Sequence, residues 1–398
     1  IRRPPRSTPS NSSAASDVYK RQFQEILKRE NLEIALVYYD ELHIANGWYL
    51  SGWCPQFESG VILVPKEGDP MILGGPESEP FAKMDSAITE TRNVPVFMVP
   101  EEEYPNARIS SFEEIFKEIG AKDKVRRIGI VGMNEMPYGV FESLSKELKG
   151  IEFVDVTKQF EEMRKIKTPW EIEAIRTSFK IADEGIKAME EKIKPGVSEY
   201  EIAAVGEGKV RSLGANWFGF KTIIGSGKRS NGVVPTASDK RLEEGEILLV
   251  GISPKYRGYS AAAGFTYIVG DKPSKEQKQY LRDLAEAFLI TRENLALGKS
   301  GREIDAPTRK FFKEKGYEKY LVCPFVHTIG INEAEAPFFG PKSDDVLKPN
   351  MTVCIDVSLF GHPDLNGIRF ETGYLITDKG IEPLSKFMEE KILSMLEI

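Results

Sequence analysis

The hydrophobic positions of the chain change period repeatedly after residue 23. Short apolar runs such as EIALVYY at residues 33–39 predict strands, and stretches with apolar residues three or four apart predict amphipathic helices. The two kinds of segment alternate as far as residue 156. This alternation predicts an α/β domain over residues 23–156.

A second domain is predicted over residues 157–398, where a helical linker leads into a long amphipathic helix. Thr168, Pro169 and Glu171 have the residue types and spacing of a capping box with proline at the first helical position. Strand-like runs follow at FGFKTIIG, EILLVGISP and YSAAAGFTYIVG, and then two helices, two strands and a closing helix. We therefore predict an α/β (α+β) fold class.

The first stretch of the chain, IRRPPRSTPSNSSAASDVYKRQ, is rich in Ser, Pro and Arg and shows no apolar periodicity. It lacks the apolar centre of a secretory signal. It resembles the translated read-through of a sequencing adaptor, and the alternative is a genuine disordered leader. We expect residues 1–22 to be a non-native or disordered leader and leave them out of the fold prediction.

Two apolar runs near the C-terminus, MTVCIDVSLF and GIRFETGYLIT, each hold one acid, Asp356 and Glu371. The short connection between them contains Gly, Pro and Asn, which predicts a hairpin. A buried ionised carboxylate is costly unless a metal ion, a base or several donors meet it. With His327 upstream, the two acids form a candidate site. The alternative is that both acids pair with arginines such as Arg369.

The composition argues against several classes of function. The chain is 41% hydrophobic and 29% charged, and its net charge of −7 argues against a nucleic-acid binder. Three cysteines in 398 residues indicate a reducing compartment, so we expect a cytoplasmic protein. We expect no membrane association, because no apolar run is long enough for a transmembrane helix. The segment GSGKRSNG lacks the spacing of a phosphate-binding loop.

Six segments occur in an order and spacing that resemble the creatinase / aminopeptidase P / prolidase superfamily. They are MRKIKTPWEIEAIR, SGKRSNGVVPTASDKRLEEGEILLV, YRGYSAAAGFTYIVGDKPSKEQ, HTIGINEAEAP, NMTVCIDVS and GIRFE. The resemblance covers the chain from about residue 23. It implies a creatinase-type N-terminal α/β domain, a pita-bread C-terminal domain and a homodimer.

Peptidases of that family hold two divalent ions with two aspartates, a histidine and two glutamates. The resemblance places these ligands at Gly251, Ala262, His327, Asp356 and Glu371, so both aspartates are missing and one glutamate is shortened to aspartate. A two-ion site needs a bridging carboxylate and several anionic ligands. A dinuclear peptidase is therefore not expected.

Two interpretations of the remaining trio stay open. His327, Asp356 and Glu371 have the donor atoms to hold one divalent ion with water positions left open. Alternatively the site is metal-free, as the resemblance to creatinase and ectoine hydrolase allows, and we favour this interpretation.

In the metal-free interpretation, few proton carriers are available. The family's two other site histidines fall on Val234 and Ala334. His327 is then the candidate base, oriented by Glu335, Glu371 or Asp356.

Five further residues are candidates, four of them with an alternative. Cys354 is expected on the same strand face as the nearby acid, as a nucleophile or, more in keeping with a buried thiol, as an inert core residue. Arg369 could clamp a substrate carboxylate or neutralise a strand acid. The resemblance places Trp53 and Phe57 on a loop that enters the neighbouring subunit's site, where aromatic walls suit a cation; the alternative is a domain-interface cluster. Tyr259 is a further candidate for substrate binding.

Together these features predict a hydrolase that cleaves a C–N bond in a small amidine-, guanidine- or proline-like molecule, or in a short peptide. A first alternative is a catalytically silent member that binds a peptide or a partner protein. A second alternative is an Xaa-Pro peptidase that works with one metal ion.

Overall fold

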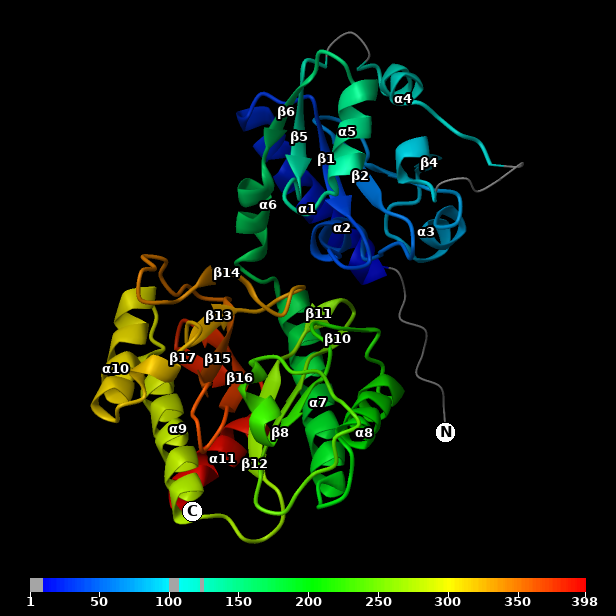
Figure 1. Cartoon of the computed structure of the whole chain (residues 1–398). Helices are drawn as coiled ribbons and strands as arrows, with labels where there is room; N and C mark the ends of the chain where they lie inside the picture. The colour runs from blue at the N-terminus through cyan, green and yellow to red at the C-terminus, as the bar shows by residue number, and fades with distance from the viewer. Residues whose placement is uncertain (1–9, 100–106, 122–124) are drawn as a thin grey trace. The chain divides into compact units, whose positions relative to one another are not determined.

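The computed structural model describes residues 10–99, 107–121 and 125–398. The chain divides into two units, Ile1–Arg164 and Lys165–Ile398 (Figure 1). The helix α6 (Thr157–Arg164), which we predicted as a linker at the start of the second domain, belongs to the first unit. In the described part of the chain, no helix is both long and apolar enough to cross a membrane.

The first unit is built on a six-stranded sheet with the strand order β4-β3-β2-β1-β5-β6. Every residue of the central strand β1 is buried, as expected for an apolar run between two neighbouring strands. β1 pairs antiparallel with β2 and parallel with β5. The strands are β1 (Ile34–Tyr39), β2 (Gly60–Pro65), β3 (Met71–Gly74), β4 (Thr91–Asn93), β5 (Arg127–Val131) and β6 (Glu152–Asp155). The helices are α1 (Ser10–Arg29), α2 (Ala45–Ser51), α3 (Glu79–Asp85), η1 (Pro95–Phe97), α4 (Phe112–Glu118), α5 (Tyr138–Glu147) and α6 (Thr157–Arg164).

The structure differs from the prediction of a disordered leader. The helix α1 begins at Ser10, so the later part of the predicted leader is helical, and residues 1–9 lie outside the described residues. The ring of Tyr19 is buried and stacks on Tyr49 with 4.1 Å between the ring centroids. Tyr19 continues the apolar stripe of α1 one turn before Phe23, a signal that the polar composition concealed.

The second unit is built on an antiparallel sheet with the order β14-β13-β15-β16-β12-β9-β8, and β17 pairs with β16. A smaller sheet has the order β11-β10-β7. The strands are β7 (Trp217–Phe218), β8 (Ile223–Ser226), β9 (Ile247–Ile252), β10 (Pro254–Tyr256), β11 (Tyr259–Ser260), β12 (Ala263–Ile268), β13 (Val326–Thr328), β14 (Glu335–Phe338), β15 (Thr352–Leu359), β16 (Ile368–Thr377) and β17 (Gly380–Pro383).

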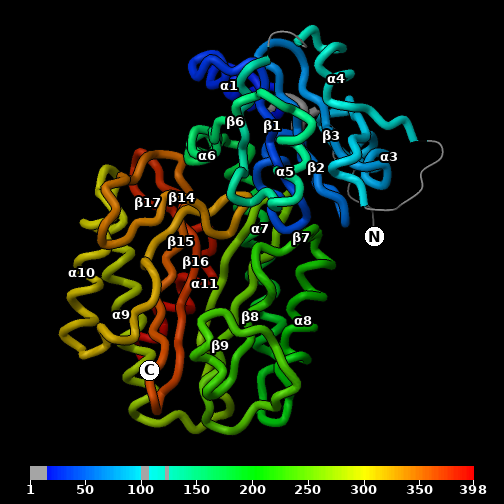
Figure 2. Tube along the Cα trace, turned by 45° about the horizontal axis from the view of Figure 1, so that its top comes forward, coloured from blue at the N-terminus to red at the C-terminus, as the bar shows by residue number. Residues whose placement is uncertain are grey.

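Helices flank the strands of the second unit, with α7 and α8 along one side and α9 and α10 along the other (Figures 1 and 2). The helices are α7 (Pro169–Lys192), α8 (Glu199–Ser212), η2 (Gly227–Gly232), α9 (Lys275–Asn294), α10 (Gly301–Glu314), η3 (Glu318–Tyr320), α11 (Lys386–Ser394) and η4 (Met395–Glu397). The capping box predicted at the start of α7 is confirmed, because the Thr168 side chain accepts a hydrogen bond from the Glu171 backbone N–H. The predicted hairpin is confirmed as β15 and β16.

Candidate active site

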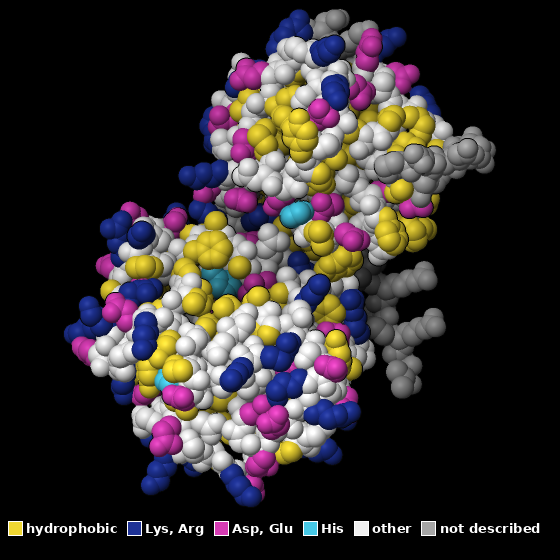
Figure 3. Space-filling model, viewed as in Figure 1, with side chains coloured by type: hydrophobic (Ala, Val, Ile, Leu, Met, Phe, Trp, Pro, Cys, Tyr) yellow, Lys and Arg dark blue, Asp and Glu magenta, His cyan; other side chains and the backbone are white. Residues whose placement is uncertain are grey.

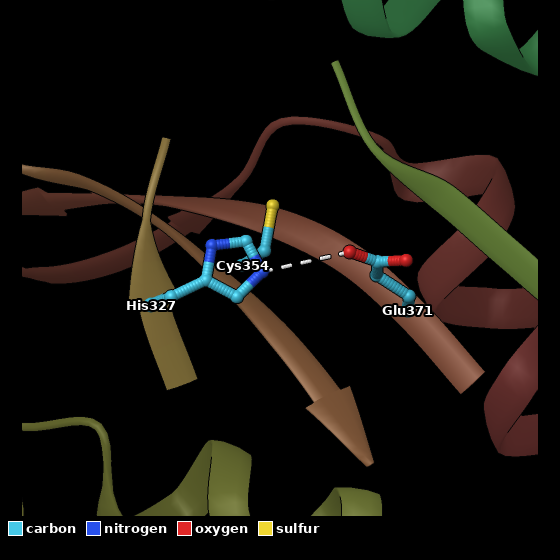
Figure 4. A group of neighbouring side chains, drawn as sticks. All are labelled: His327, Cys354 and Glu371. Carbon is cyan, nitrogen blue, oxygen red and sulfur yellow. Dashed lines mark ion pairs between the residues drawn. The ribbon is translucent and has the colours of Figure 1, made fainter. Parts of the chain in front are cut away.

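The pairing of three strands brings the candidate side chains to one face of the main sheet. His327 on β13 pairs with Cys354 on β15, and Asp356 on β15 pairs with Glu371 on β16. Directly paired residues share a face, and so do alternate residues along one strand. This register therefore places Arg369 on the same face, two residues before Glu371. Figure 4 shows His327, Cys354 and Glu371 converging from their separate strands.

The side chains of His327, Asp356, Arg369 and Glu371 line a cavity of about 190 Å³. The other walls contain Glu333 and Cys323 but are mostly apolar, formed by Phe220, Ile223, Val233, Val234, Pro324, Ala334 and Phe338. Two of these, Val234 and Ala334, stand where the resemblance expects histidines, so those positions contribute apolar walls instead of proton carriers. Figure 3 shows hydrophobic side chains gathered on this face of the second unit, around a partly covered histidine.

His327 is held between a backbone carbonyl and two carboxylates. Its Nδ1 lies 3.0 Å from the carbonyl oxygen of Thr328, which can only accept, so Nδ1 carries the hydrogen. Its Nε2 lies 3.6 Å from an oxygen of Glu333 and 3.6 Å from an oxygen of Glu371. Burial alone would lower the pKa of His327, but the two carboxylates raise it to about 9.

Arg369 neutralises Asp356. Its Nε donates a hydrogen bond to Asp356 Oδ1 at 3.0 Å, and both residues are buried. Burial raises the pKa of Asp356 to about 6, although the charge of Arg369 opposes that rise. Burial likewise raises the pKa of Glu371. The counter-ion alternative considered for Arg369 therefore describes its contact with Asp356.

Glu335 is the first residue of β14, directly after the loop that follows β13. It pairs with Lys167 at 3.3 Å, and both side chains are almost fully buried. Its other oxygen accepts a hydrogen bond from the backbone N–H of Asn332 at 3.0 Å. The sequence analysis named Glu335, Glu371 or Asp356 as the acid that orients His327. The acids that face this imidazole are Glu371 and Glu333, each 3.6 Å from Nε2.

Residues of the small sheet hold the loop that carries Glu333 through hydrogen bonds. Lys255 is buried, and its Nζ donates a hydrogen bond to the carbonyl oxygen of Ile331 at 2.7 Å. The hydroxyl of Ser260 donates to the same oxygen at 3.0 Å, and the Ser260 N–H donates to the carbonyl oxygen of Gly330 at 2.7 Å. The sequence signal for Glu333 was the pair of acids in NEAEAP directly after the histidine strand.

The three aromatic candidates are not among the described residues that line this cavity. Trp53 belongs to the first unit, where it is 7% exposed and its ring packs edge-on against Tyr39. Phe57, in the same unit, is 85% exposed. Tyr259 is buried on β11, and its hydroxyl donates to Glu171 at 2.9 Å.

The residues present do not fit a pair of metal ions. Gly251 and Ala262 offer no donor atoms, and a Cβ at Gly251 would lie 3.3 Å from the side chain of Ile223. Asp356 is held by Arg369. What remains is a smaller group, in which donor atoms of His327, Cys354 and Glu371 all lie within 4.8 Å of one another.

Comparison with known proteins gives consistent matches. A model of metallopeptidase family M24 matches residues 173–378, and one of the creatinase/prolidase N-terminal domain matches residues 20–166. The chain is 30% identical over 371 residues to an Xaa-Pro dipeptidase of Pyrococcus furiosus, covering 91% of this chain and 99% of the relative. It is 31% identical over 347 residues to the Xaa-Pro dipeptidase of Pyrococcus horikoshii, covering 87% of this chain and 92% of the relative. The crystal structure of the prolidase from Pyrococcus horikoshii OT3 superposes with a TM-score of 0.79 at 27% identity, covering 92% of this chain and 98% of that one.

Proposed function

Because the chain belongs to metallopeptidase family M24 and carries a creatinase/prolidase N-terminal domain, we propose that it hydrolyses a C–N bond in a small amidine-, guanidine- or proline-like molecule without a dinuclear metal centre. The matches confirm the predicted resemblance and the pita-bread architecture. The further specification of the substrate and the chemistry rests on the cavity.

The observation that carries the proposal is the charge balance of this cavity. Glu333, Asp356 and Glu371 line it, and Arg369 pairs with only one of these acids. The acids Glu333 and Glu371 therefore supply a negative site beside largely apolar walls. A small substrate with one positive charge and an apolar body complements this arrangement, as an amidinium, a guanidinium or the α-ammonium of a dipeptide would.

The chain's own residues can carry the proton transfers of such a hydrolysis. Of the two carboxylates that face His327, that of Glu333 is the more exposed, with 18% of its side chain accessible against 3% for Glu371. It can take a proton from a water molecule as the water oxygen attacks the carbon. The C–N bond then breaks with its electron pair on nitrogen, and the same proton passes to that nitrogen.

A second candidate is Xaa-Pro dipeptide hydrolysis, favoured by the two relatives that carry that activity in their names. The proline ring suits the apolar walls formed by Phe220, Val233 and Phe338. The two candidates differ in the bond attacked, so a substrate panel separates them.

The test is turnover by the full chain on creatine, ectoine, guanidino acids and Xaa-Pro dipeptides. We expect one cationic member to be hydrolysed, and we expect Glu371→Gln to lose more than about 99% of this activity. The matched control is Glu191→Gln, at an exposed acid on α7, which should retain it. Tight binding in a thermal-shift assay without turnover of any member would instead favour the catalytically silent alternative.

A cytoplasmic location and a homodimer complete the proposal. All three cysteines, Cys54, Cys323 and Cys354, are free, which is consistent with a reducing compartment. Light scattering of the purified chain tests the dimer, and a monomer at working concentration would argue against a site shared between subunits.

A further inference from the structure

Two carboxylates approach the Nε2 atom of His327 from different residues. Oxygens of Glu333 and Glu371 each lie 3.6 Å away, and the sulfur of Cys354 belongs to the same cluster (Figure 4). His327, Cys354 and Glu371 are all buried. Two carboxylates that meet on one nitrogen in a buried cavity require a positive charge between them, which is either a proton or a metal ion.

The distances decide between these two possibilities. A proton on Nε2 would form a charge-assisted hydrogen bond, whose N···O distance is about 2.7–2.9 Å. Both N···O distances are 3.6 Å, which is too long for such a bond. Ligands at about 2.0–2.3 Å from one tetrahedral ion lie roughly 3.3–3.7 Å apart. The separation between His327 Nε2 and Glu371 therefore matches one edge of a coordination polyhedron, and the sulfur of Cys354 lies within 4.8 Å of both ligand atoms.

The surroundings of His327 also match a metal ligand. Its Nδ1–H donates to the carbonyl oxygen of Thr328, which leaves the Nε2 lone pair directed into the cavity. Metal-binding histidines are commonly oriented by such a contact. Asp356, which we counted among possible ligands from the sequence, is instead engaged by Arg369 at 3.0 Å.

We propose that His327, Cys354 and Glu371 bind a single divalent ion of borderline softness, such as Zn²⁺, with Glu333 facing its open position. A thiolate ligand favours Zn²⁺ or Co²⁺ over Mg²⁺ or Mn²⁺. A bound ion would contradict the metal-free interpretation that we favoured from the sequence. Cys354, the cross-strand partner of His327, would be a ligand outside the family's usual set. The ion site rests on the proposed function only in that His327, Glu333 and Glu371 line the cavity used there.

The probe is Co²⁺, because a cobalt–thiolate bond gives a charge-transfer absorption band in the near ultraviolet. The full chain is stripped with chelator, titrated with Co²⁺ and followed by absorption and elemental analysis. We expect about one ion per chain and a charge-transfer band. In Cys354→Ser the band should disappear and the Co²⁺ affinity should fall at least about tenfold.

The matched control is Cys323→Ser. Cys323 lines the same cavity, and its sulfur lies 3.5 Å from the hydroxyl of Ser358, so it tests whether any thiol nearby gives the band. The control should keep the band at full strength. Glu371→Gln is a second variant that removes a ligand but keeps the thiol. It should weaken Co²⁺ binding while the band still forms at saturation.

Three results would overturn the inference. They are a folded wild-type chain that binds no Co²⁺, a full-strength band in Cys354→Ser, and two bound ions per chain. Hydrolysis of the substrate panel is scored separately. A cobalt band without turnover of any substrate supports the ion site and counts against the proposed hydrolysis, and turnover by a chain that binds no metal does the reverse.

Discussion

The carboxylate of Glu199 is fully buried at the start of α8 and can be used to test how the cavity wall is held. Its oxygens accept hydrogen bonds from the backbone N–H and the hydroxyl of Ser226, at 2.8 Å each, and from those of Ser238, at 3.0 and 2.7 Å. The Nε of Arg229 donates to it at 3.0 Å. One side chain therefore fastens both ends of the segment that contains η2 and the wall residue Val233.

Replacing Glu199 by Ala leaves this set of donors without their acceptor. Each buried donor left unsatisfied costs about 1–3 kcal/mol, and removing one member of a buried charged pair costs about 3–5 kcal/mol. Water can reach the partly exposed Arg229, whose side chain is 40% accessible, which reduces the sum. We expect the free energy of unfolding of the second unit to fall by roughly 3–5 kcal/mol.

The assay is urea denaturation of the full chain combined with hydrogen exchange, because a chain with two units need not unfold in one step. Peptides from residues 223–240 should show the largest gain in exchange. The matched control is Glu201→Ala on the same helix, whose side chain is 46% exposed and which should cost much less stability than Glu199→Ala. A loss below about 1 kcal/mol for Glu199→Ala would refute the reasoning.

Three further predictions concern other parts of the second unit. Lys255→Met removes the donor to the Ile331 carbonyl oxygen, so we expect faster hydrogen exchange in the loop after β13 and a loss of about 1–3 kcal/mol; unchanged exchange there would argue against anchoring by this lysine. Burial raises the pKa of Asp183 to about 6, so ionising it costs stability as the pH rises through that value. Asp183→Asn should therefore stabilise the chain by roughly 1–3 kcal/mol near pH 8 and by less near pH 5, and equal effects in thermal melts at the two pH values would contradict the assignment. Gly373→Ala would place a Cβ 2.2 Å from the ring of Phe179; we expect a loss of about 1–3 kcal/mol that Phe179→Leu partly restores, and a neutral Gly373→Ala in urea melts would count against this packing.

The strand hairpin was predictable because each apolar run holds a single acid and a turn-forming connection separates the two runs. Alternation along each strand then indicates which side chains share a face, and this reasoning placed Cys354 beside Asp356. The pairing of Cys354 with His327 was not predictable, because the register between β13 and β15 joins segments separated by a loop and a third strand. Sequence periodicity carries no information about such a register.

Glu333 was missed for a different reason. The pairing of β13 with β14 shifts between His327 and Thr328, and the loop that follows is shaped by hydrogen bonds to distant residues such as Lys255. No local pattern in NEAEAP distinguishes the acid that turns toward the imidazole from Glu335, which turns toward Lys167. The first turns of α1 were missed because polar residues surround Tyr19.

The absence of a side chain at Gly264 has its own consequence. Gly264 pairs with Glu371, and a Cβ built there would lie 3.1 Å from the Cβ of Glu371 and 3.2 Å from the Cδ of Arg369. A methyl group at this position would press on an acid and a base together while removing neither charge. Directed evolution could therefore use position 264 to alter ligand preference through shape alone.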